Sequence, residues 1–348
     1  MAWPWNNADR SGTLAIAFGT DSLAYAHATL AGGCRLRRCG SLPLKGVRPQ
    51  DVGDRLRSLG LPTRSVVAVL PLADCQLLQV EAPAVPQDEL KAAARWSIKE
   101  LVNEHVDDLT LDVMYAGDDR PRARKNVFVA ITANRVIREL VERCETGGLT
   151  LAAIDIRETA QRNLQMAAPA ASRRDQANAL LMRHGNQCLL TISANGELFY
   201  TRRLEWEDPI AAAAPRQAAH ALAGVPDTQP GLAGDSGFPD LVDYGAELAE
   251  PHSDMPRIAL EVQRSLDLWD RSWPELPLAP LSVEAGSQGP ALAGLLSRQL
   301  GLQVDVFDAG AAIAGFAASS PADTGGHTAR AQVIPLLGAL LRQAPHAA

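Results

Sequence analysis

The sequence contains no run of about 18 consecutive apolar residues, the length that a membrane-spanning helix requires. Its first residues, Met1 to Trp5, lack the basic start and apolar stretch of a secretory signal, although two tryptophans stand among them. We therefore expect a chain that neither spans a membrane nor is exported. The tryptophan-bearing tail is expected to pack on the body of the protein.

None of the five cysteines belongs to a C-x-x-C pair, and their odd number does not suit a complete set of disulfides. We expect a reducing compartment in which the cysteines serve as small core residues. Cys144 is an example, because it lies on the apolar face of a predicted helix. Core packing is favoured there over a nucleophilic role.

The chain also lacks an excess of positive charge, since its formal net charge is -7. A mildly acidic protein is not drawn as a whole to nucleic acid or to anionic lipid. Two short basic runs stand at 35–38 and 120–125. Charged side chains normally stay exposed, so these runs are interpreted as solvated strand ends and loops.

Familiar catalytic patterns are absent as well, including G-x-x-x-x-G-K-[ST], HExxH and G-x-S-x-G. His184, beside Arg183, has the chemistry of a phosphate-binding or acid–base residue, but a turn histidine is favoured. Asp112, Asp155 and Glu205 could pair as acid and base. They lie in separate predicted strands, so satisfied or exposed carboxylates are favoured, and no active site is recognisable.

What is present is an ordinary globular composition over 348 residues, with 47% hydrophobic and 21% charged residues. This length suits two domains, or one domain with a sizeable insertion. The first part of the chain predicts a β-meander followed by a helix and a strand. The expected strands are 13–18, 23–30, 34–39 and 65–70, and the expected helix is 51–59.

Residues 75–155 predict a compact unit of mixed helices and strands. Asp88 can cap a helix that carries Leu90, Ala94, Ile98 and Leu101 on one stripe. A second helix begins at 134 and ends at the glycine pair 147–148. The expected strands of this unit are 76–80, 109–115, 126–132 and 151–156.

The remainder begins with an Ala-, Pro- and Arg-rich stretch, 166–177, interpreted as a linker. Asn195-Gly196 between two apolar runs then predicts a hairpin over 188–204. Residues 207–255 are expected to be rich in loops. Helices are expected from Pro256 through Trp269, over 289–300 and over 333–342, with strands at 278–283 and 302–307. Two halves that each open with a β-meander predict an α/β duplicated actin-like (ribonuclease H-like) fold with a small inserted α+β subdomain.

Four stretches resemble the PilM family of type IV pilus assembly proteins, and within it the MshI proteins of MSHA pili. They occur in the family's order and span most of the chain. They are Pro83 to Val102, the hairpin Leu189 to Arg203, Glu261 to Leu266 (E-x-x-R-S-L) and Gly289 to Val304.

The resemblance implies a first actin-like half at 10–74 and 156–177, an inserted (SHS2-like) subdomain at 75–155 and a second half at 178–348. It implies a cytoplasmic protein held at the inner membrane by a partner. That partner would be a single-pass pilus platform protein whose N-terminal cytoplasmic segment lies in a groove of this chain, somewhere in residues 60–155. A homodimer is left open, and neither nucleic acid nor a membrane span of its own is expected.

The family's better-known members bind ATP in a cleft, with an acidic residue on the first strand of each half for magnesium. Those two positions fall at Ala17 and Met182 here. Neither side chain offers the oxygen ligands that magnesium requires. The remnants of a nucleotide site would be Gly19, Thr20, Asp21, Gly185, Gly286 and Gly289. Plain turn glycines are favoured over nucleotide contacts, so no cofactor and no metal are expected, and ATP with magnesium stays an alternative.

The sequence thus favours a binding scaffold of a type IV pilus machine with a degenerate nucleotide site and no enzymatic activity. One alternative is an ATP-binding switch with slow ATPase activity, for which Asp21 is the acid nearest to the first lost position. Another is a subunit like the cytoplasmic domain of a type II secretion platform. Those proteins continue into a transmembrane helix, which is not found before Ala348.

Overall fold

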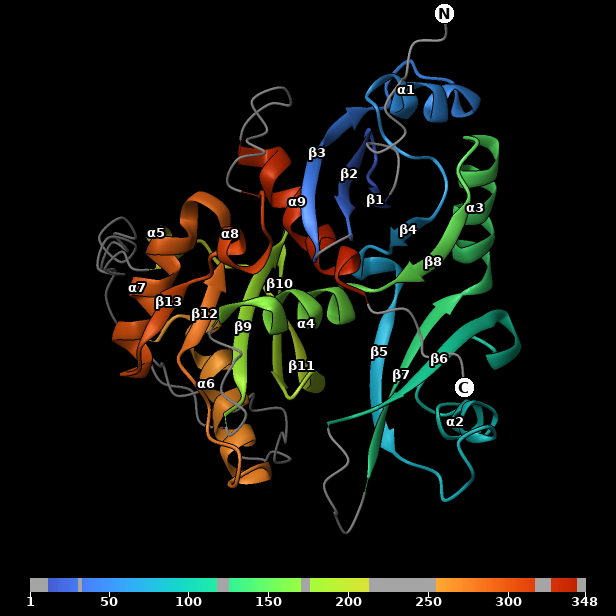
Figure 1. Ribbon diagram of the computed structural model, residues 1–348. Coiled ribbons are helices and arrows are strands. Elements are labelled where there is room, and N and C mark those ends of the chain that lie inside the picture. Colours follow the sequence, from blue (N-terminus) through green and yellow to red (C-terminus); the bar gives the residue numbers. More distant parts are fainter. Residues whose placement is uncertain are drawn as a thin grey trace, which may run out of the picture.

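The computed structural model describes residues 12–30, 33–117, 125–169, 176–212, 255–316 and 327–342. Figure 1 shows two β-sheets on either side of a central pair of helices, with a third, smaller sheet beside the first. Most of the predicted loop-rich region 207–255, much of the predicted linker 166–177 and most of the basic run 120–125 lie outside the described residues.

The first sheet has the strand order β3-β2-β1-β4-β8. β1 pairs antiparallel with β2 and parallel with β4, while β3 and β8 complete the two sides. The predicted opening meander is therefore present. The bounds are β1 Thr13–Phe18, β2 Ser22–Thr29, β3 Arg35–Pro43, β4 Val66–Val69 and β8 Leu151–Asp155.

The second sheet repeats this plan, in the order β11-β10-β9-β12-β13. β9 pairs antiparallel with β10 and parallel with β12, as β1 does with its two neighbours. The same order with the same directions makes the two halves duplicates in topology. The bounds are β9 Asn178–His184, β10 Gln187–Ala194, β11 Glu197–Glu205, β12 Leu281–Glu284 and β13 Val304–Val306.

The third sheet, β5-β7-β6, forms the inserted subdomain. Helix α2 packs on one face of it through Leu90, Ala94 and Ile98, which contact strand residues such as Leu111 and Val129. These positions, the last of them directly after the helix, are four residues apart, and the strand positions have the alternate spacing of one sheet face. The bounds are β5 Gln76–Glu81, α2 Leu90–Ser97, β6 Leu109–Tyr115 and β7 Asn126–Ala133.

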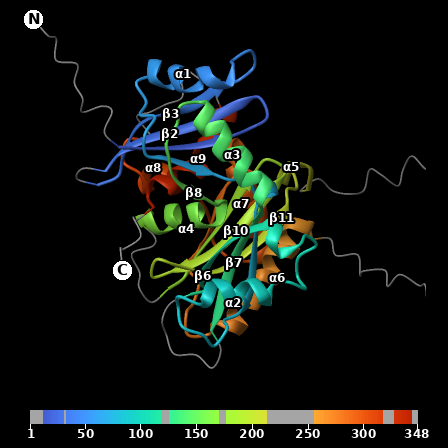
Figure 2. The same cartoon turned by 90° about the vertical axis from the view of Figure 1, so that its right-hand side faces the viewer.

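The end of the insertion differs from the predicted boundary at 155. β8 is the fifth strand of the first sheet, and α3 (Asn134–Thr146) buries Cys144 against that sheet's outer face. In Figure 2, α3 runs beside the first half, at the top of the view, and beside the insertion, at the bottom. The alternation of strands and helices in the sequence predicts a closed unit, but β8 pairs with β4 of the first sheet.

Two helices, α4 (Arg157–Ala167) and α9 (His327–Leu340), lie between the two large sheets. They contact each other, and one apolar cluster joins them to the inner faces of both sheets. On the first sheet this face is made largely of alanines, which leave room for a helix at close range: Ala15, Ala17, Ala24, Ala26 and Ala28.

α9 thus packs mainly on the first half, although its sequence stands at the end of the region predicted as the second half. The helix α4 was not predicted at all. Both differences have the same cause, since these helices contribute to the core between the halves. The hydrophobic pattern within one half of the sequence does not indicate which helices will pack in a core shared by both halves.

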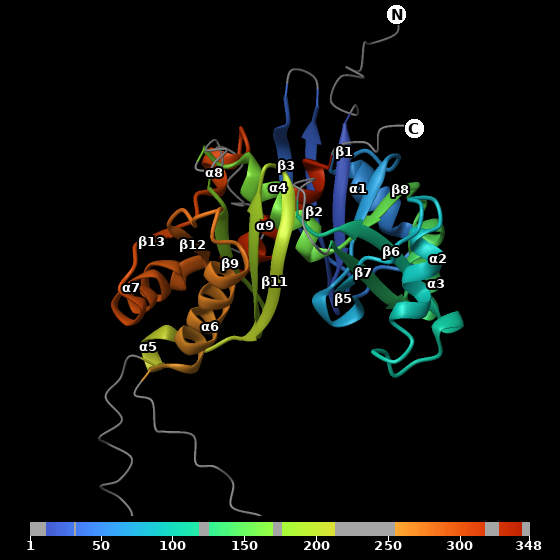
Figure 3. The same ribbon diagram turned by 90° about the horizontal axis from the view of Figure 1, so that it is seen from below.

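The outer faces of the two sheets are covered by separate helices (Figure 3). α1 (Val52–Ser58) and α3 cover the first sheet, and α6 (Arg257–Ser272) and α7 (Gly289–Leu300) cover the second. Phe199 packs edge-to-face against Trp269 and Trp273 under α6. Two short helices, α5 (Pro209–Ala212) and α8 (Ala309–Ala312), complete the second half.

None of the five cysteines is disulfide-bonded, and four of them are buried. Burial raises the pKa of Cys144 to about 11, which is consistent with the predicted core role over a reactive thiolate. Within the described residues, no helix is both long enough and apolar enough to cross a membrane.

Gly338 marks the closest approach of α9 to α4. A Cβ built at Gly338 would lie only 1.6 Å from the Ala160 carbonyl oxygen. We predict that Gly338→Ala destabilises the protein by about 1–3 kcal/mol or more, because the backbone of α4 must move. The free energy of unfolding from urea titrations measures this effect.

Gly294→Ala in α7 is the matched control. Its Cβ would meet only the flexible end of Arg298, at 3.3 Å. An alanine there should be neutral or stabilising by about 0.5–1 kcal/mol. Equal effects of the two substitutions would contradict the close packing of α4 and α9.

Candidate functional site

The main candidate site is a cavity of about 710 Å³ at the junction of all three sheets. One wall is the face of the inserted sheet that α2 leaves uncovered, including Met114, Phe128 and Ala130. The opposite wall is the end of β8 and the polar side of α4. The tip of the β10–β11 hairpin, with Asn195 and Gly196, also lines the cavity. So do Leu341 and Arg342, which follow α9.

A second cavity of about 620 Å³ adjoins the first and shares part of β6 and the hairpin tip with it. We call the two together the β6 groove, because Asp112, Val113 and Met114 line both cavities. Among the described strands, β6 pairs with β7 alone and is an edge of its sheet. An edge strand carries unpaired backbone groups, so the groove can accept an extended chain.

The hairpin tip that closes the groove follows from its sequence. Asn195 and Gly196 have φ values of 53° and 87°, the left-handed backbone that a two-residue hairpin turn requires. This confirms the predicted Asn-Gly turn. The tip places Glu197 3.7 Å from Arg162 of α4. Across the groove, Lys91 lies 3.4 Å from Asp112, and both of these side chains are well exposed.

Asp155 lies at the base of the groove and is only 5% exposed. Its Oδ1 accepts hydrogen bonds from the Ile156 amide, at 2.9 Å, and from the Thr159 hydroxyl. Its Oδ2 is buried and accepts none from the described residues. The nearest cation, Arg342 Nη1, is 3.9 Å away.

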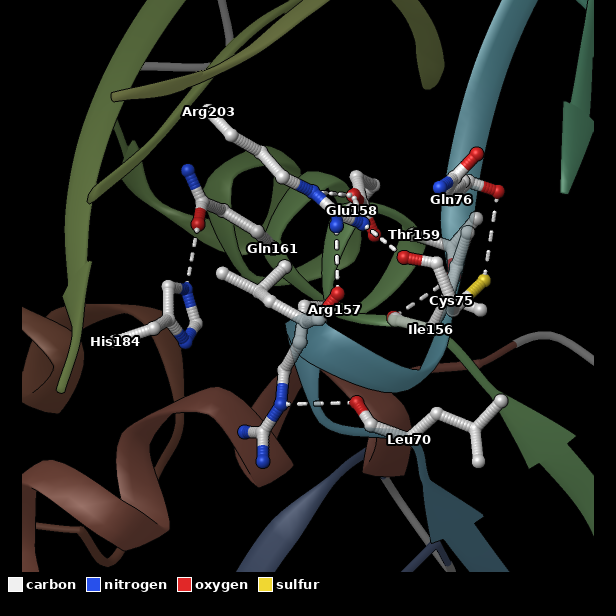
Figure 4. A network of polar contacts seen from close by, with 11 residues as sticks. Leu70, Cys75, Gln76, Ile156, Arg157, Glu158, Thr159, Gln161, His184 and Arg203 are labelled. Carbon is white, nitrogen blue, oxygen red and sulfur yellow. Dashed lines mark hydrogen bonds and ion pairs between the residues drawn. The ribbon is translucent and has the colours of Figure 1, made fainter. Parts of the chain in front are cut away.

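A network of buried polar groups surrounds the first turn of α4 (Figure 4). Glu158 is 1% exposed and pairs with Arg203 of β11, whose Nη2 lies 2.7 Å from Glu158 Oε1. The same guanidinium donates to the carbonyls of Leu72, at 2.6 Å, and Cys75, at 2.7 Å. Arg203 therefore joins the second half to α4 and to the chain entering the insertion.

Gln161 and Gln165 extend this network along α4. The Gln161 amide donates to the carbonyls of Leu180 and Leu189, both at 2.9 Å, and Gln165 accepts from the Thr191 hydroxyl at 3.0 Å. These bonds satisfy buried groups that would otherwise be costly. They fix the helix against β9 and β10.

His184, at the end of β9, completes the network from the second half. Its Nε2 lies 3.3 Å from Gln161 Oε1. Burial lowers the pKa of His184 well below its usual value, and the cations Arg157 and Arg203 lower it further. The imidazole is therefore neutral at neutral pH, as a structural histidine would be. Burial also lowers the pKa of Arg157, to about 10, and its Nε donates to the Leu70 carbonyl.

The residues predicted as nucleotide-site remnants occupy three separate turns. Gly19, Thr20 and Asp21 are exposed between β1 and β2, and Gly185 is exposed between β9 and β10. Gly286 begins the turn η7 (Gly286–Gln288) after β12, and its amide donates to the Glu284 carboxylate. The last of them, Gly289, is buried at the start of α7 against Val306.

The two positions that would carry magnesium-binding acids do not fit the ion. Ala17 and Met182 are both buried in the apolar cluster between the halves. An alanine methyl group and a thioether offer no hard oxygen ligand. In the described part of the chain, no three His, Cys, Asp or Glu side chains are placed to hold a metal ion.

Only two of the three carboxylates considered as an acid–base set lie at the same cavity. Asp112 and Asp155 line the same cavity, whereas Glu205 is exposed and pairs with Arg257 at 2.6 Å. Asp112 is exposed and paired, as favoured from the sequence. Asp155 differs from that expectation, because its Oδ2 is buried and has no hydrogen bond to any described residue.

Sequence reasoning missed the polar residues of α4, which carry most of the buried network. Charged and amide side chains occupy most of the helix surface, so its apolar stripe of Ala160 and Leu164 is narrow. The available signal was Asp155 followed three residues later by Glu158, a typical pattern at the start of a helix. The spacing of Ala160 and Leu164 agrees with it.

No protein-family model matches this chain, and no curated protein is a match in sequence. Solved structures do resemble it. The structure described as "PilM-PilN type IV pilus biogenesis complex" has a TM-score of 0.65 and 17% identity, over 96% of this chain and 100% of that chain. Together with the repeated strand order, this similarity confirms the predicted duplicated actin-like fold.

Two further structures are more distant. The cytoplasmic domain of EpsL, an inner membrane component of the type II secretion system of Vibrio cholerae, has a TM-score of 0.41 and 14% identity. That match covers 59% of this chain and 76% of that chain. A Bacteroides thetaiotaomicron protein with an actin-like ATPase fold and unknown function has a TM-score of 0.49 and 9% identity, over 98% of this chain and 100% of that chain.

The pairing of Arg203 with Glu158 generates a stability prediction. Arg203→Met should cost about 3–5 kcal/mol, because it leaves the Glu158 carboxylate buried without its cation. The double variant Arg203→Met/Glu158→Met should be more stable than Arg203→Met alone. Urea unfolding of all the variants, including Glu158→Met, completes the double-mutant cycle.

Arg257→Met is the control, because it breaks the Arg257–Glu205 pair, in which both side chains are exposed. Its effect should stay within about 1 kcal/mol. If Arg203→Met were as mild as Arg257→Met, the buried pair would not hold the three parts of the chain together.

Proposed function

We propose that this chain is an assembly component of a type IV pilus machine that holds an extended segment of a membrane-anchored partner in the β6 groove. The observation that carries the proposal is the groove itself: an edge strand, β6, borders two adjoining cavities of about 710 and 620 Å³. Strand addition is a common route by which such an edge captures a peptide. The proposal places the partner between the insertion and the first half, within the predicted range 60–155 and across to α4 and the hairpin.

The fold similarity supports the pilus context. The structure with a TM-score of 0.65 is one of PilM in complex with PilN, so that fold does engage a partner. By this analogy, the partner here is a single-pass inner-membrane platform protein, and its N-terminal cytoplasmic segment is the captured part. This chain would then be cytoplasmic and held at the membrane through that contact. The motifs from Pro83 to Val304 favour the MSHA type of pilus over others.

We further propose that the nucleotide site is degenerate and that the chain works without ATP hydrolysis. The buried, apolar surroundings of Ala17 and Met182 support this, because both positions that would need a carboxylate belong to the core. An actin-like body would then serve as a rigid frame for the groove. Homodimerisation stays open as a second means of assembly.

The binding proposal is tested with synthetic peptides of the cytoplasmic N-terminal segments of PilN-like membrane proteins from the same genome. Fluorescence anisotropy should show saturable binding to the full chain. Ala130→Trp should reduce it about tenfold or more, because the new side chain fills the cavity that Ala130 lines.

Ala311→Trp, on the exposed side of α8, is the control and should bind the peptides as the unmodified chain does. Circular dichroism melts verify that both variants are folded. Undiminished binding by the Ala130→Trp variant would place the partner elsewhere.

The degenerate site is tested by thermal melts with and without millimolar Mg-ATP. A ligand at about 100 times its dissociation constant adds roughly 2.7 kcal/mol, or on the order of 2–4 °C for a chain of this size. We expect no shift. A rise of that size that is lost without magnesium would favour the ATP-dependent switch, and Asp21→Ala would then be examined for loss of ATPase activity.

A further inference from the structure

Asp155 is a buried carboxylate with one oxygen unused, at the base of the β6 groove. Its backbone is fixed, because it ends β8 beside Val69 and its carbonyl accepts from the Leu70 amide at 2.9 Å. Its Oδ1 is held by the Ile156 amide and the Thr159 hydroxyl. These bonds leave Oδ2 as the part of the carboxylate that another donor can use.

The lack of a donor at Oδ2 is costly for the protein. A buried ionised group is stabilised only by hydrogen bonds and opposite charge. Among the described residues, none donates to Oδ2, and Arg342 Nη1, at 3.9 Å, is beyond hydrogen-bond distance. The protein alone therefore leaves part of this carboxylate unsatisfied.

Arg342 is a cover for Asp155 that can be displaced. Its side chain is 39% exposed, it lines the same cavity, and it follows the last turn of α9. At 3.9 Å this ion pair includes no hydrogen bond, so it lacks the charge-assisted bond that would hold Arg342 firmly in place. A second cation that reaches Oδ2 at a proper hydrogen-bond distance would replace Arg342 at little cost.

The rest of the cavity defines which cation fits. Around Asp155 the walls carry apolar as well as polar side chains, and Met114, Phe128, Ile156 and Met166 are among the apolar ones. A lysine or arginine side chain combines an apolar stem with a cationic end, so its stem matches these apolar side chains while its end meets the carboxylate. The other acids that line this cavity, Asp112 and Glu197, already have cationic neighbours, Lys91 and Arg162.

We propose that Asp155 is the specificity-determining residue of the β6 groove and that it receives a basic side chain of the captured segment, which displaces Arg342. This inference rests on the proposed function. It adds the chemical identity of the partner's anchoring residue, which nothing in the fold comparison specifies.

The test uses short synthetic peptides with blocked ends that differ at one central position, which is lysine, arginine, norleucine or glutamate. Norleucine keeps the apolar stem of lysine and removes its charge. The full chain should bind the lysine and arginine peptides about tenfold or more tightly than the norleucine peptide, as a charge-assisted hydrogen bond provides.

Three variants then distinguish the role of Asp155 from that of Arg342, because they are expected to change peptide binding in different directions. Asp155→Asn keeps an acceptor for Ile156 and should erase the preference for lysine over norleucine. Arg342→Ala should strengthen lysine binding about two- to fivefold, because it removes the competing cation. Glu205→Gln, at an exposed acid that lines neither cavity, should leave the preference unchanged.

The outcomes distinguish this inference from the function on which it rests. Equal binding of lysine and norleucine peptides, an intact preference in Asp155→Asn, or weaker lysine binding in Arg342→Ala would overturn the role of Asp155 while the groove remains a peptide site. If no peptide binds, or if Ala130→Trp leaves all binding in place, the proposed function fails together with this inference. Arg342→Ala keeps the test decisive even if Asp155→Asn does not fold.

Discussion

The burial of Glu158 is the constraint on which the rest of the arrangement depends. A carboxylate that is 1% exposed requires a cation, and Arg203 supplies it from the opposite half of the molecule. The remaining donors of that guanidinium then have fixed targets, the Leu72 and Cys75 carbonyls, which lie just before the insertion begins. One ion pair therefore fixes the positions of the second half, α4 and the start of the insertion relative to one another.

The β6 groove is a consequence of that geometry. Its walls come from the insertion, from α4 and from the β10–β11 hairpin, and none of these alone forms a cavity. Arg203 lies on β11, and Glu158 directly precedes Thr159 and lies one turn from Arg162, both of which line the groove. The apolar cluster between the halves fixes the other side of α4. The groove is thus largely formed before any partner arrives, which reduces the ordering that binding must impose.

The sequence predicted the parts of the fold that show local periodicity. Strands such as Thr13–Phe18 and Leu109–Tyr115, the helix Gly289–Leu300 and the Asn195-Gly196 turn were predicted at or near their observed bounds, because alternation, apolar stripes and turn residues are local signals. The helix α4 was not predicted, since Gln161 and Gln165 are buried by partners far along the chain. Asp155 was grouped with ordinary carboxylates, because an unused oxygen is a property of the packed site and has no sequence pattern.

The position of α9 has a consequence for the order in which the protein forms during synthesis. The strands of the first sheet leave the ribosome before the second half, yet α9, which covers their alanine-rich inner face through Leu336 and Leu337, follows the second half in the sequence. Domains generally fold as units while they are made. Here α9 cannot cover the inner face of the first sheet until the second half has also been made, so the nascent protein carries that apolar sheet face without its helix while the second half is synthesised.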